Sequence, residues 1–252
     1  MKEKIILTGL LFLFLPLCGA SADTESATAL FSKGNQYYDG GKFDQAIEEY
    51  EKIVNLGIKN YQVFYNLGNA YFRQNQLGKA VLNYRRALVF KPGDDDTEAN
   101  LTYVKLFTLD KLEEQKMNPF SNLLQWFLGF SSKDNLALLT SLFYILSVVL
   151  GIFMLSWGSK RYLLFGLISF LILFIISGTS LWAKIKVDSI NYGVVVVTQA
   201  EVRSGPGSDY VLQFTGHEGL ELRVDEQAEG WYRISLPNGI KGWISKEAVE
   251  II

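Results

Sequence analysis

The sequence predicts a multidomain chain with three parts: an all-α helical repeat, an α-helical hairpin that spans a membrane, and an all-β barrel. Three observations carry this prediction. Residue types recur at a fixed interval of 34 in the first part of the chain, and that period is typical of stacked helical pairs. Two uncharged apolar stretches follow, each long enough to cross a bilayer. The chain then changes to short β-type runs separated by turn residues.

The N-terminal residues have the pattern of an export signal. Lys2 and Lys4 precede an apolar run over residues 5–17. The small-x-small sequence of residues 20–22 then matches a signal-peptidase site. We therefore expect residues 1–22 to be a signal peptide that is removed.

Cysteine and histidine usage limits the chemistry. Cys18 offers an alternative, lipid-modified start of the mature chain, although Leu17 stands where a lipoprotein signal has a small residue. Cleavage after residue 22 would leave no cysteine for a disulfide or a metal site. His217 is the single histidine, and a lone histidine among strands is more typical of a surface position than of catalysis. We expect no cofactor and no bound metal.

The net charge and the absence of known catalytic motifs argue against two further classes of protein. The net charge is −2, without the basic footprint of a nucleic-acid-binding protein. The chain has no Cys–His pair, no Gly-x-Ser-x-Gly elbow and no phosphate-binding loop. We therefore expect a protein that is not an enzyme and does not bind nucleic acid.

The 34-residue period identifies the repeat. Small residues let paired helices approach closely, and tyrosines fill the space between them. The recurring positions are Gly34, Tyr37, Ala46 and Tyr50, followed by Gly68, Tyr71, Ala80 and Tyr84. Together with Leu67, Ala87 and Pro92, this pattern resembles the tetratricopeptide repeat, with units at residues 27–60 and 61–94.

Two units are few for a stable array, because about three are normally needed. Residues 94–96 are aspartates, which favour a helix N-terminus, and an apolar pattern follows. We expect a capping helix at residues 95–116 that completes a domain over residues 27–116. Residues 117–136 form an amphipathic linker, whose aromatic side chains either lie along the membrane surface or pack on the hairpin.

The resemblance also implies a binding surface. The first helix of each tetratricopeptide pair faces a concave groove, and peptide-binding members use an asparagine there to hold an extended segment. In this register the groove residues are Phe31, Asn35, Tyr38, Tyr65, Asn69, Phe72 and Arg73. Phe31 stands where a carboxylate-binding member has a lysine. The groove therefore suits an extended peptide or a partner helix.

Residues 137–157 and 162–182 are uncharged apolar stretches that we predict to be transmembrane helices. The link between them, residues 158–161, is so short that the two helices must form an antiparallel hairpin. The alternative is a buried hairpin in a soluble domain. The aromatic residues expected at the membrane interface are Trp157, Tyr162 and Trp182.

The export signal sets the expected topology. If the repeats are exported, Lys160 and Arg161 lie in the cytoplasm and the C-terminal module returns to the outside. Lys133, Lys184 and Lys186 flank the opposite side, so the positive-inside rule adds little. We expect an inner-membrane protein with two spans and both soluble modules extracytoplasmic. Neither span contains a charged side chain, so the sequence does not indicate transport.

The C-terminal pattern resembles the bacterial SH3 domain over residues 190–252. Three short sequences carry the resemblance, namely residues 202–207, 230–232 and 242–244. It implies peptide or cell-wall ligands on an aromatic surface, with Arg203, Tyr210, Trp231 and Trp243 as candidates. Alternatively, the two tryptophans are ordinary core and rim residues.

The order of the parts is similar to that of the tetratricopeptide member of the Bat aerotolerance operon proteins. That resemblance implies a membrane-anchored scaffold with a role in stress tolerance. Its partners would be membrane or periplasmic proteins, including von Willebrand A-type proteins of the same system, in addition to the lipid bilayer. The alternative is a cell-wall protein that binds or senses peptidoglycan through its SH3 domain.

Overall fold

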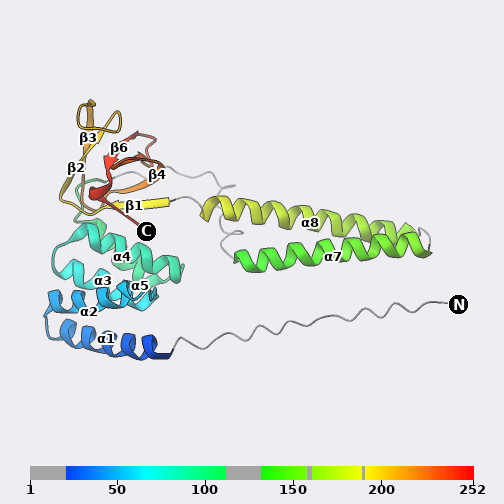
Figure 1. Cartoon of the computed structure of the whole chain (residues 1–252), viewed down its shortest axis with the longest axis horizontal. Coiled ribbons are helices and arrows are strands. Elements are labelled where there is room, and N and C mark those ends of the chain that lie inside the picture. The colour runs from blue at the N-terminus through cyan, green and yellow to red at the C-terminus, as the bar shows by residue number, and fades with distance from the viewer. Residues whose placement is uncertain (1–20, 112–131, 158–160, 189–190) are drawn as a thin grey trace.

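The computed structural model describes residues 21–111, 132–157, 161–188 and 191–252. A helical domain and a β domain form one body, from which a long helical hairpin projects (Figure 1). This architecture confirms the predicted fold class: helical repeats, two apolar helices and an antiparallel sheet. The predicted signal segment, except its last two residues, and most of the predicted linker lie outside the described residues.

Paired helices build the repeat domain, which comprises residues 21–111. Its helices are α1 (Ser21–Asp39), α2 (Phe43–Asn55), α3 (Tyr61–Arg73), α4 (Leu77–Phe90) and α5 (Asp95–Lys105). A Cβ atom on Gly34 would lie 2.5 Å from the Tyr50 ring, and one on Gly68 would lie 2.7 Å from the Tyr84 ring. Both rings are buried. Glycine is therefore needed at both positions for α1 to approach α2 and for α3 to approach α4.

Helix α5 corresponds to the first helix of a third unit. Asn100 lies 34 residues after Asn66, and both make the same kind of contact, described below. The helix ends at Lys105, so it is shorter than the predicted capping helix. The residues that follow turn toward the β domain instead, where the Asp110 carboxylate accepts a hydrogen bond from the backbone N–H of His217 (2.6 Å).

Asp94 caps the N-terminus of α5. Its carboxylate accepts hydrogen bonds from the Thr97 N–H (3.1 Å), the Thr97 hydroxyl (2.6 Å) and the Tyr61 hydroxyl (2.6 Å). It also pairs with Lys91 at 2.5 Å. These contacts, above all the one with Lys91, hold the pKa of Asp94 well below its ordinary value.

We expect the stability of the repeat domain to decline in acid partly through Asp94. A carboxyl group with a lowered folded pKa stabilises the fold above its unfolded pKa of about 4. That contribution is lost as the pH falls through the lower folded pKa. Thermal unfolding of the full chain in micelles, from about neutral pH to about pH 2, measures the decline. The stability of the Asp94→Asn variant, whose asparagine can still cap the helix, should decline less steeply as the pH falls. Equal slopes of stability against pH in the two proteins would contradict the expectation.

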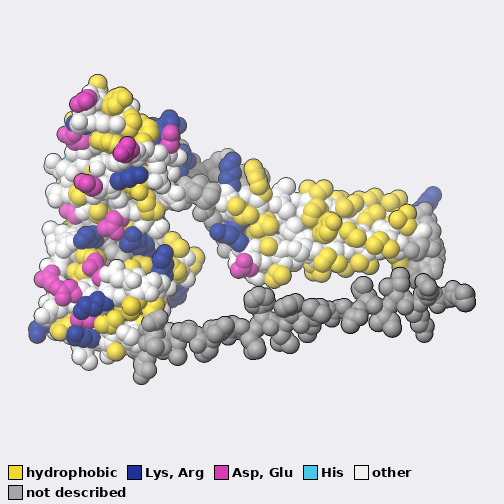
Figure 2. Space-filling model, viewed as in Figure 1, with side chains coloured by type: hydrophobic (Ala, Val, Ile, Leu, Met, Phe, Trp, Pro, Cys, Tyr) yellow, Lys and Arg dark blue, Asp and Glu magenta, His cyan; other side chains and the backbone are white. Residues whose placement is uncertain are grey.

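The hairpin consists of α7 (Lys133–Trp157) and α8 (Arg161–Asp188), which pack side by side along their length (Figure 1). Both helices are long and apolar enough to cross a membrane. Figure 2 shows mainly hydrophobic side chains along the hairpin, whereas charged side chains are scattered over the body among other types. Leu155 is 89% exposed and Ile175 is 60% exposed. A hairpin in the core of a soluble domain would bury such residues, so the structure does not support that alternative.

We expect a charge at the middle of α8 to impair membrane insertion. Ile175→Arg places a cation near the centre of the span, where insertion costs about 3 kcal/mol. Ile185→Arg is the matched control, because Ile185 is also exposed but lies near the helix end between Lys184 and Lys186. The fraction of the chain that resists alkaline extraction from membranes should fall only for Ile175→Arg. An equal effect of both changes would argue against a span.

The β domain, residues 191–252, is one antiparallel sheet with strand order β3-β2-β6-β5-β4-β1-β7. Its strands are β1 (Asn191–Val195), β2 (Gln199–Arg203), β3 (Leu212–His217), β4 (Glu221–Ala228), β5 (Trp231–Ser235), β6 (Lys241–Ser245) and β7 (Val249–Ile251). Alternation along β5 buries Ile234 and directs Arg233 outward. Gly239, with φ of +86°, lies in the tight turn between β5 and β6.

The repeat domain and the β domain pack directly against each other. Val194 of β1 is fully buried within the core of the repeats. The Gly78 N–H at the start of α4 donates to the Glu218 carboxylate (3.2 Å). A Cβ on Gly78 would lie 2.5 Å from the Val195 carbonyl oxygen. The backbones of the two domains therefore meet without room for a side chain at this point.

Ion pairs surround this contact. Glu221 of β4 pairs with Arg85 of α4 (2.7 Å) and with Lys105 of α5 (2.5 Å). Arg86 donates to the Ile251 carbonyl oxygen (2.7 Å). Three elements of the β domain, namely β1, β4 and β7, thus contact the last two helices of the repeats.

The β domain lies where the second helix of a third repeat would stack. One unit earlier, Lys79 of α4 lies over the ring of Tyr71 in α3, at 5.1 Å. Lys105 is the residue of α5 that corresponds to Tyr71, and it is covered by Glu221 of the β domain instead. The β domain therefore closes the exposed end of the two-repeat array, which explains how so few units are stabilised.

Candidate functional site

Two equivalent hydrogen-bonded clusters join successive helices of the repeats. The Asn35 Oδ1 atom accepts from the Tyr50 hydroxyl (2.7 Å) and from the Asn66 amide (3.0 Å). One unit later, the Asn69 Oδ1 atom accepts from the Tyr84 hydroxyl (2.7 Å) and from the Asn100 amide (3.2 Å). The asparagine at this repeat position therefore links α1 to α3 in the first unit and α3 to α5 in the second.

These bonds orient the two predicted asparagines. Burial raises the pKa of Tyr50 to about 12 and that of Tyr84 further, so both phenols remain donors near neutral pH. Because the amide oxygens of Asn35 and Asn69 are occupied, their NH2 groups remain to bind a ligand. Within the described residues, neither NH2 group donates to another group of the protein.

A hollow of about 310 Å³ adjoins the first cluster. Asn35, Tyr38, Asp39, Tyr50 and Asn66 line it. Two of these residues, Asn35 and Tyr38, belong to the predicted groove. Of the others, Tyr50 of α2 is a recurring packing position of the repeat, whereas Asp39 at the end of α1 and Asn66 of α3 were not singled out by the sequence pattern.

The other end of the groove is aromatic. The ring of Phe72 contacts those of Tyr103 and Phe107, each at 5.7 Å between centroids, and the latter two are 5.2 Å apart. Tyr103 and Phe107 are about half exposed. Tyr103 lies 34 residues after Asn69, and Leu106 lies 34 after Phe72. Extending the repeat period into α5 would therefore have identified this part of the surface.

The remaining predicted groove residues mainly support the helices. The Phe31 ring packs on Tyr50 (5.8 Å). The Tyr65 hydroxyl accepts from the Asn100 amide (3.0 Å). The Arg73 guanidinium lies over the ring of Phe43 (5.0 Å).

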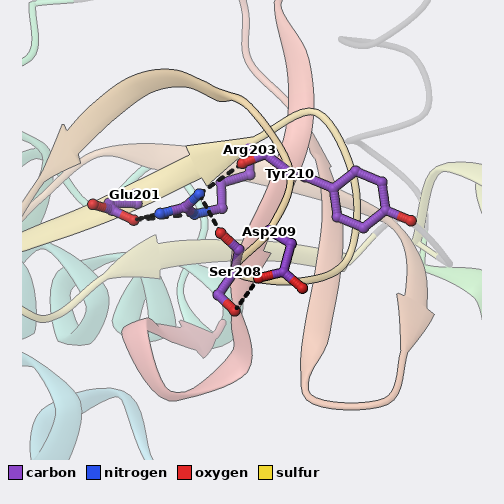
Figure 3. A network of polar contacts seen from close by, with 5 residues as sticks. All are labelled: Glu201, Arg203, Ser208, Asp209 and Tyr210. Atoms are coloured by element: carbon purple, nitrogen blue, oxygen red, sulfur yellow. Dashed lines mark hydrogen bonds and ion pairs between the residues drawn. The ribbon is translucent and has the colours of Figure 1, made fainter.

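In the β domain, Arg203 organises the loop between β2 and β3. Its Nη1 donates to the carbonyl oxygens of Ser208 and Tyr210, each at 2.6 Å, and the guanidinium pairs with Glu201 (Figure 3). The ring of Tyr210 packs on Gly205, where a Cβ would lie 2.4 Å from it. Figure 3 shows this ring directed away from the pair of Arg203 with Glu201. Arg203 thus holds the loop, and Tyr210 remains about half exposed.

The two predicted tryptophans lie on the outer face of the sheet. Trp243 of β6 is in register with Arg203 on one side and with Arg233 on the other. Trp231 of β5 is in register with Ser245, so the tryptophans are diagonal neighbours. Both are partly exposed. The structure therefore brings Trp231, Trp243 and Arg203 to one face.

His217, the single histidine, lies at the contact between the domains. Its Nδ1 is 3.1 Å from the Asp110 carboxylate. No group of three or more His, Cys, Asp or Glu side chains that could hold a metal ion occurs within the described residues.

The fold and the repeated contacts define a helical-repeat chain with an appended β domain, and comparisons with known proteins name both modules. Residues 34–75 match the model of the TPR repeat, and residues 61–94 match the tetratricopeptide repeat. Residues 198–250 match the bacterial SH3 domain. The chain thus contains tetratricopeptide repeats and a bacterial SH3 domain, both of which are typically non-catalytic interaction modules.

Similar proteins share only part of the chain. RNA polymerase II-associated protein 3 is 31% identical over 98 residues in Rattus norvegicus and over 106 residues in Homo sapiens. Each match covers 39% of this chain and 15% of the relative. The first TPR of Spaghetti bound to the HSP90 peptide SRMEEVD is 26% identical, covering 33% of this chain and 68% of that chain, with a TM-score of 0.32. A mutant O-GlcNAc transferase of Thermobaculum terrenum is 21% identical, covering 33% of this chain and 16% of that chain, also with a TM-score of 0.32.

Proposed function

We propose that this protein is a membrane-anchored, extracytoplasmic scaffold that binds partner proteins through its repeat groove. The observation that carries the proposal is the packing of two interaction modules into one body beside a membrane-type hairpin. The hairpin holds that body at the membrane surface, and the groove presents amides and exposed aromatic rings to a partner.

The contact between the modules supports a common side of the membrane for both. Val194 can be buried among the repeats only if the β domain and the repeat domain lie in the same compartment. A hairpin of two spans returns the chain to its starting side, which meets this condition. The predicted export signal places that side outside the cytoplasmic membrane.

The partners proposed are membrane or periplasmic proteins of an aerotolerance or stress-related complex. This follows from the similarity of the module order to the tetratricopeptide member of the Bat operon proteins. Von Willebrand A-type proteins of the same system are the partners that this similarity implies. Spaghetti, with similar repeats, was solved with a peptide, and by analogy we propose that a partner segment lies in the groove here.

Photocrosslinking from the groove tests the proposal. A photoreactive amino acid placed at Leu106, which is 62% exposed, is activated in native membranes, and the products are identified by mass spectrometry. We expect von Willebrand A-type or other envelope proteins. The matched probe at Val89, which is equally exposed but does not belong to the groove positions, should not capture them. Capture of the same proteins from both positions, or of none from Leu106, would contradict a groove-bound partner.

A second candidate function is recognition of peptidoglycan by the SH3 domain. The partly exposed pair of Trp231 and Trp243, next to Arg233, favours it, because aromatic faces bind sugars and peptides. Purified sacculi should then retain the protein in detergent solution. Loss of retention in Trp243→Ala would support this function, whereas absence of retention by the unaltered protein would exclude it.

A further inference from the structure

We propose that the groove binds an extended protein segment through a lysine or arginine side chain seated beside Asp39. This deepens the proposed function and rests on it. The argument starts from the hollow between α1, α2 and α3, described above, and from the chemistry of its lining.

Asp39 is the single charged residue that lines this hollow. The other lining groups are two phenols and two amides, from Tyr38, Tyr50, Asn35 and Asn66. No ion pair of Asp39 occurs within the described residues. A carboxylate with aromatic and amide neighbours attracts a cation, since it can accept charge-assisted hydrogen bonds while the ring faces contact the aliphatic stem.

The same lining disfavours a carboxylate ligand. A free C-terminus or an acidic side chain in the hollow would face Asp39 without a compensating cation from the lining. The nearest groove cation, Arg73, lies over the ring of Phe43, which contacts the Tyr38 ring (5.3 Å), so Arg73 is near the hollow but does not line it. Phe31, where a basic residue would otherwise supply positive charge, packs against Tyr50. The lining of the hollow is therefore neutral to acidic.

A second anchor lies one helix further along. The half-exposed rings of Tyr103 and Phe107, together with the partly buried ring of Phe72, provide an apolar contact between α3 and the end of α5. Adjacent helices lie about 10 Å apart, and an extended chain advances about 3.3 Å per residue. Because alternate side chains of an extended segment share a face, the apolar side chain should lie about two or four positions from the basic one. The NH2 groups of Asn35 and Asn69 would hold its backbone between these anchors.

Selection from a peptide library tests the chemistry of the site. The full chain in lipid nanodiscs is incubated with N-acetylated, C-amidated peptides of about nine residues, long enough to cross the groove. Bound peptides are sequenced by mass spectrometry. A parallel library has free carboxyl termini. We expect enrichment of lysine or arginine, with an apolar residue about two or four positions away, and no preference for the free terminus.

Variants separate this inference from the proposed function. Asp39→Asn should weaken the best peptide about tenfold, the usual effect of losing a charge-assisted contact, and Asp39→Lys should change the preference to acidic residues. Glu48→Gln, an exposed change of equal charge on α2, is the control and should have no effect. Bound peptides without a basic residue, or with a required free carboxylate, would overturn the inference. Failure of every peptide to bind would contradict the peptide-binding groove, and with it the proposed function.

Discussion

Replacing Gly78 by valine is expected to separate the β domain from the repeats. The added Cβ would lie 2.5 Å from the Val195 carbonyl oxygen and 3.0 Å from the Val196 Cα. Both are backbone atoms, so no side-chain rotation can relieve the clash. The strand β1 must move, and Val194 then leaves the core of the repeats. We expect a loss of about 2–3 kcal/mol in the free energy of unfolding, comparable to overpacking elsewhere.

Hydrogen exchange of the full chain in micelles measures this effect. In Gly78→Val, the amides of β1 and α4 should exchange faster, whereas the hairpin should be unaffected. Gln45→Val is the control, because Gln45 is exposed near the start of α2 and receives the same β-branched side chain. Unchanged protection of β1 in Gly78→Val would show that the two domains do not depend on this contact. The β domain would then not be the cap of the array.

Tyr84→Ala is expected to destabilise the repeat domain by about 4 kcal/mol, as removal of a large core side chain does. Tyr84 is 1% exposed. Its ring fills the space above Gly68, and its hydroxyl donates to Asn69. The substitution therefore leaves a cavity between α3 and α4 and also releases a groove residue. Helices α3 to α5 should unfold at a lower denaturant concentration.

Tyr84→Phe separates packing from hydrogen bonding. The ring stays, and Asn69 keeps the hydrogen bond from Asn100, so the expected loss is only about 1 kcal/mol. Denaturant unfolding of both variants, followed by hydrogen exchange of α3 and α4, gives the comparison. Equal losses would mean that the hydroxyl, and not the ring, holds the two helices together.

The candidate site was partly predictable, because its residues follow the repeat period. Asn35 and Asn69 were found as groove positions, and the structure shows that they occupy equivalent clusters. Tyr103 was missed because the period was not extended past Pro92. Asp39 was missed because it lies at the end of α1, where the repeat carries no shared residue type. Arg203 holds its loop by donating to backbone carbonyl groups. Such contacts cannot be predicted from the spacing of side-chain types along the sequence.

Local sequence patterns predict the elements: the 34-residue period predicts helix pairs, the length of the uncharged stretches predicts apolar helices, and alternation predicts strands. These are local properties, since each depends on residues within one or two turns or on a short repeat. That the β domain closes the repeat array is seen only in the folded protein. That contact joins Gly78 to Glu218, which are 140 residues apart. Such packing depends on the shape and charge of two folded surfaces, and no local period carries that information.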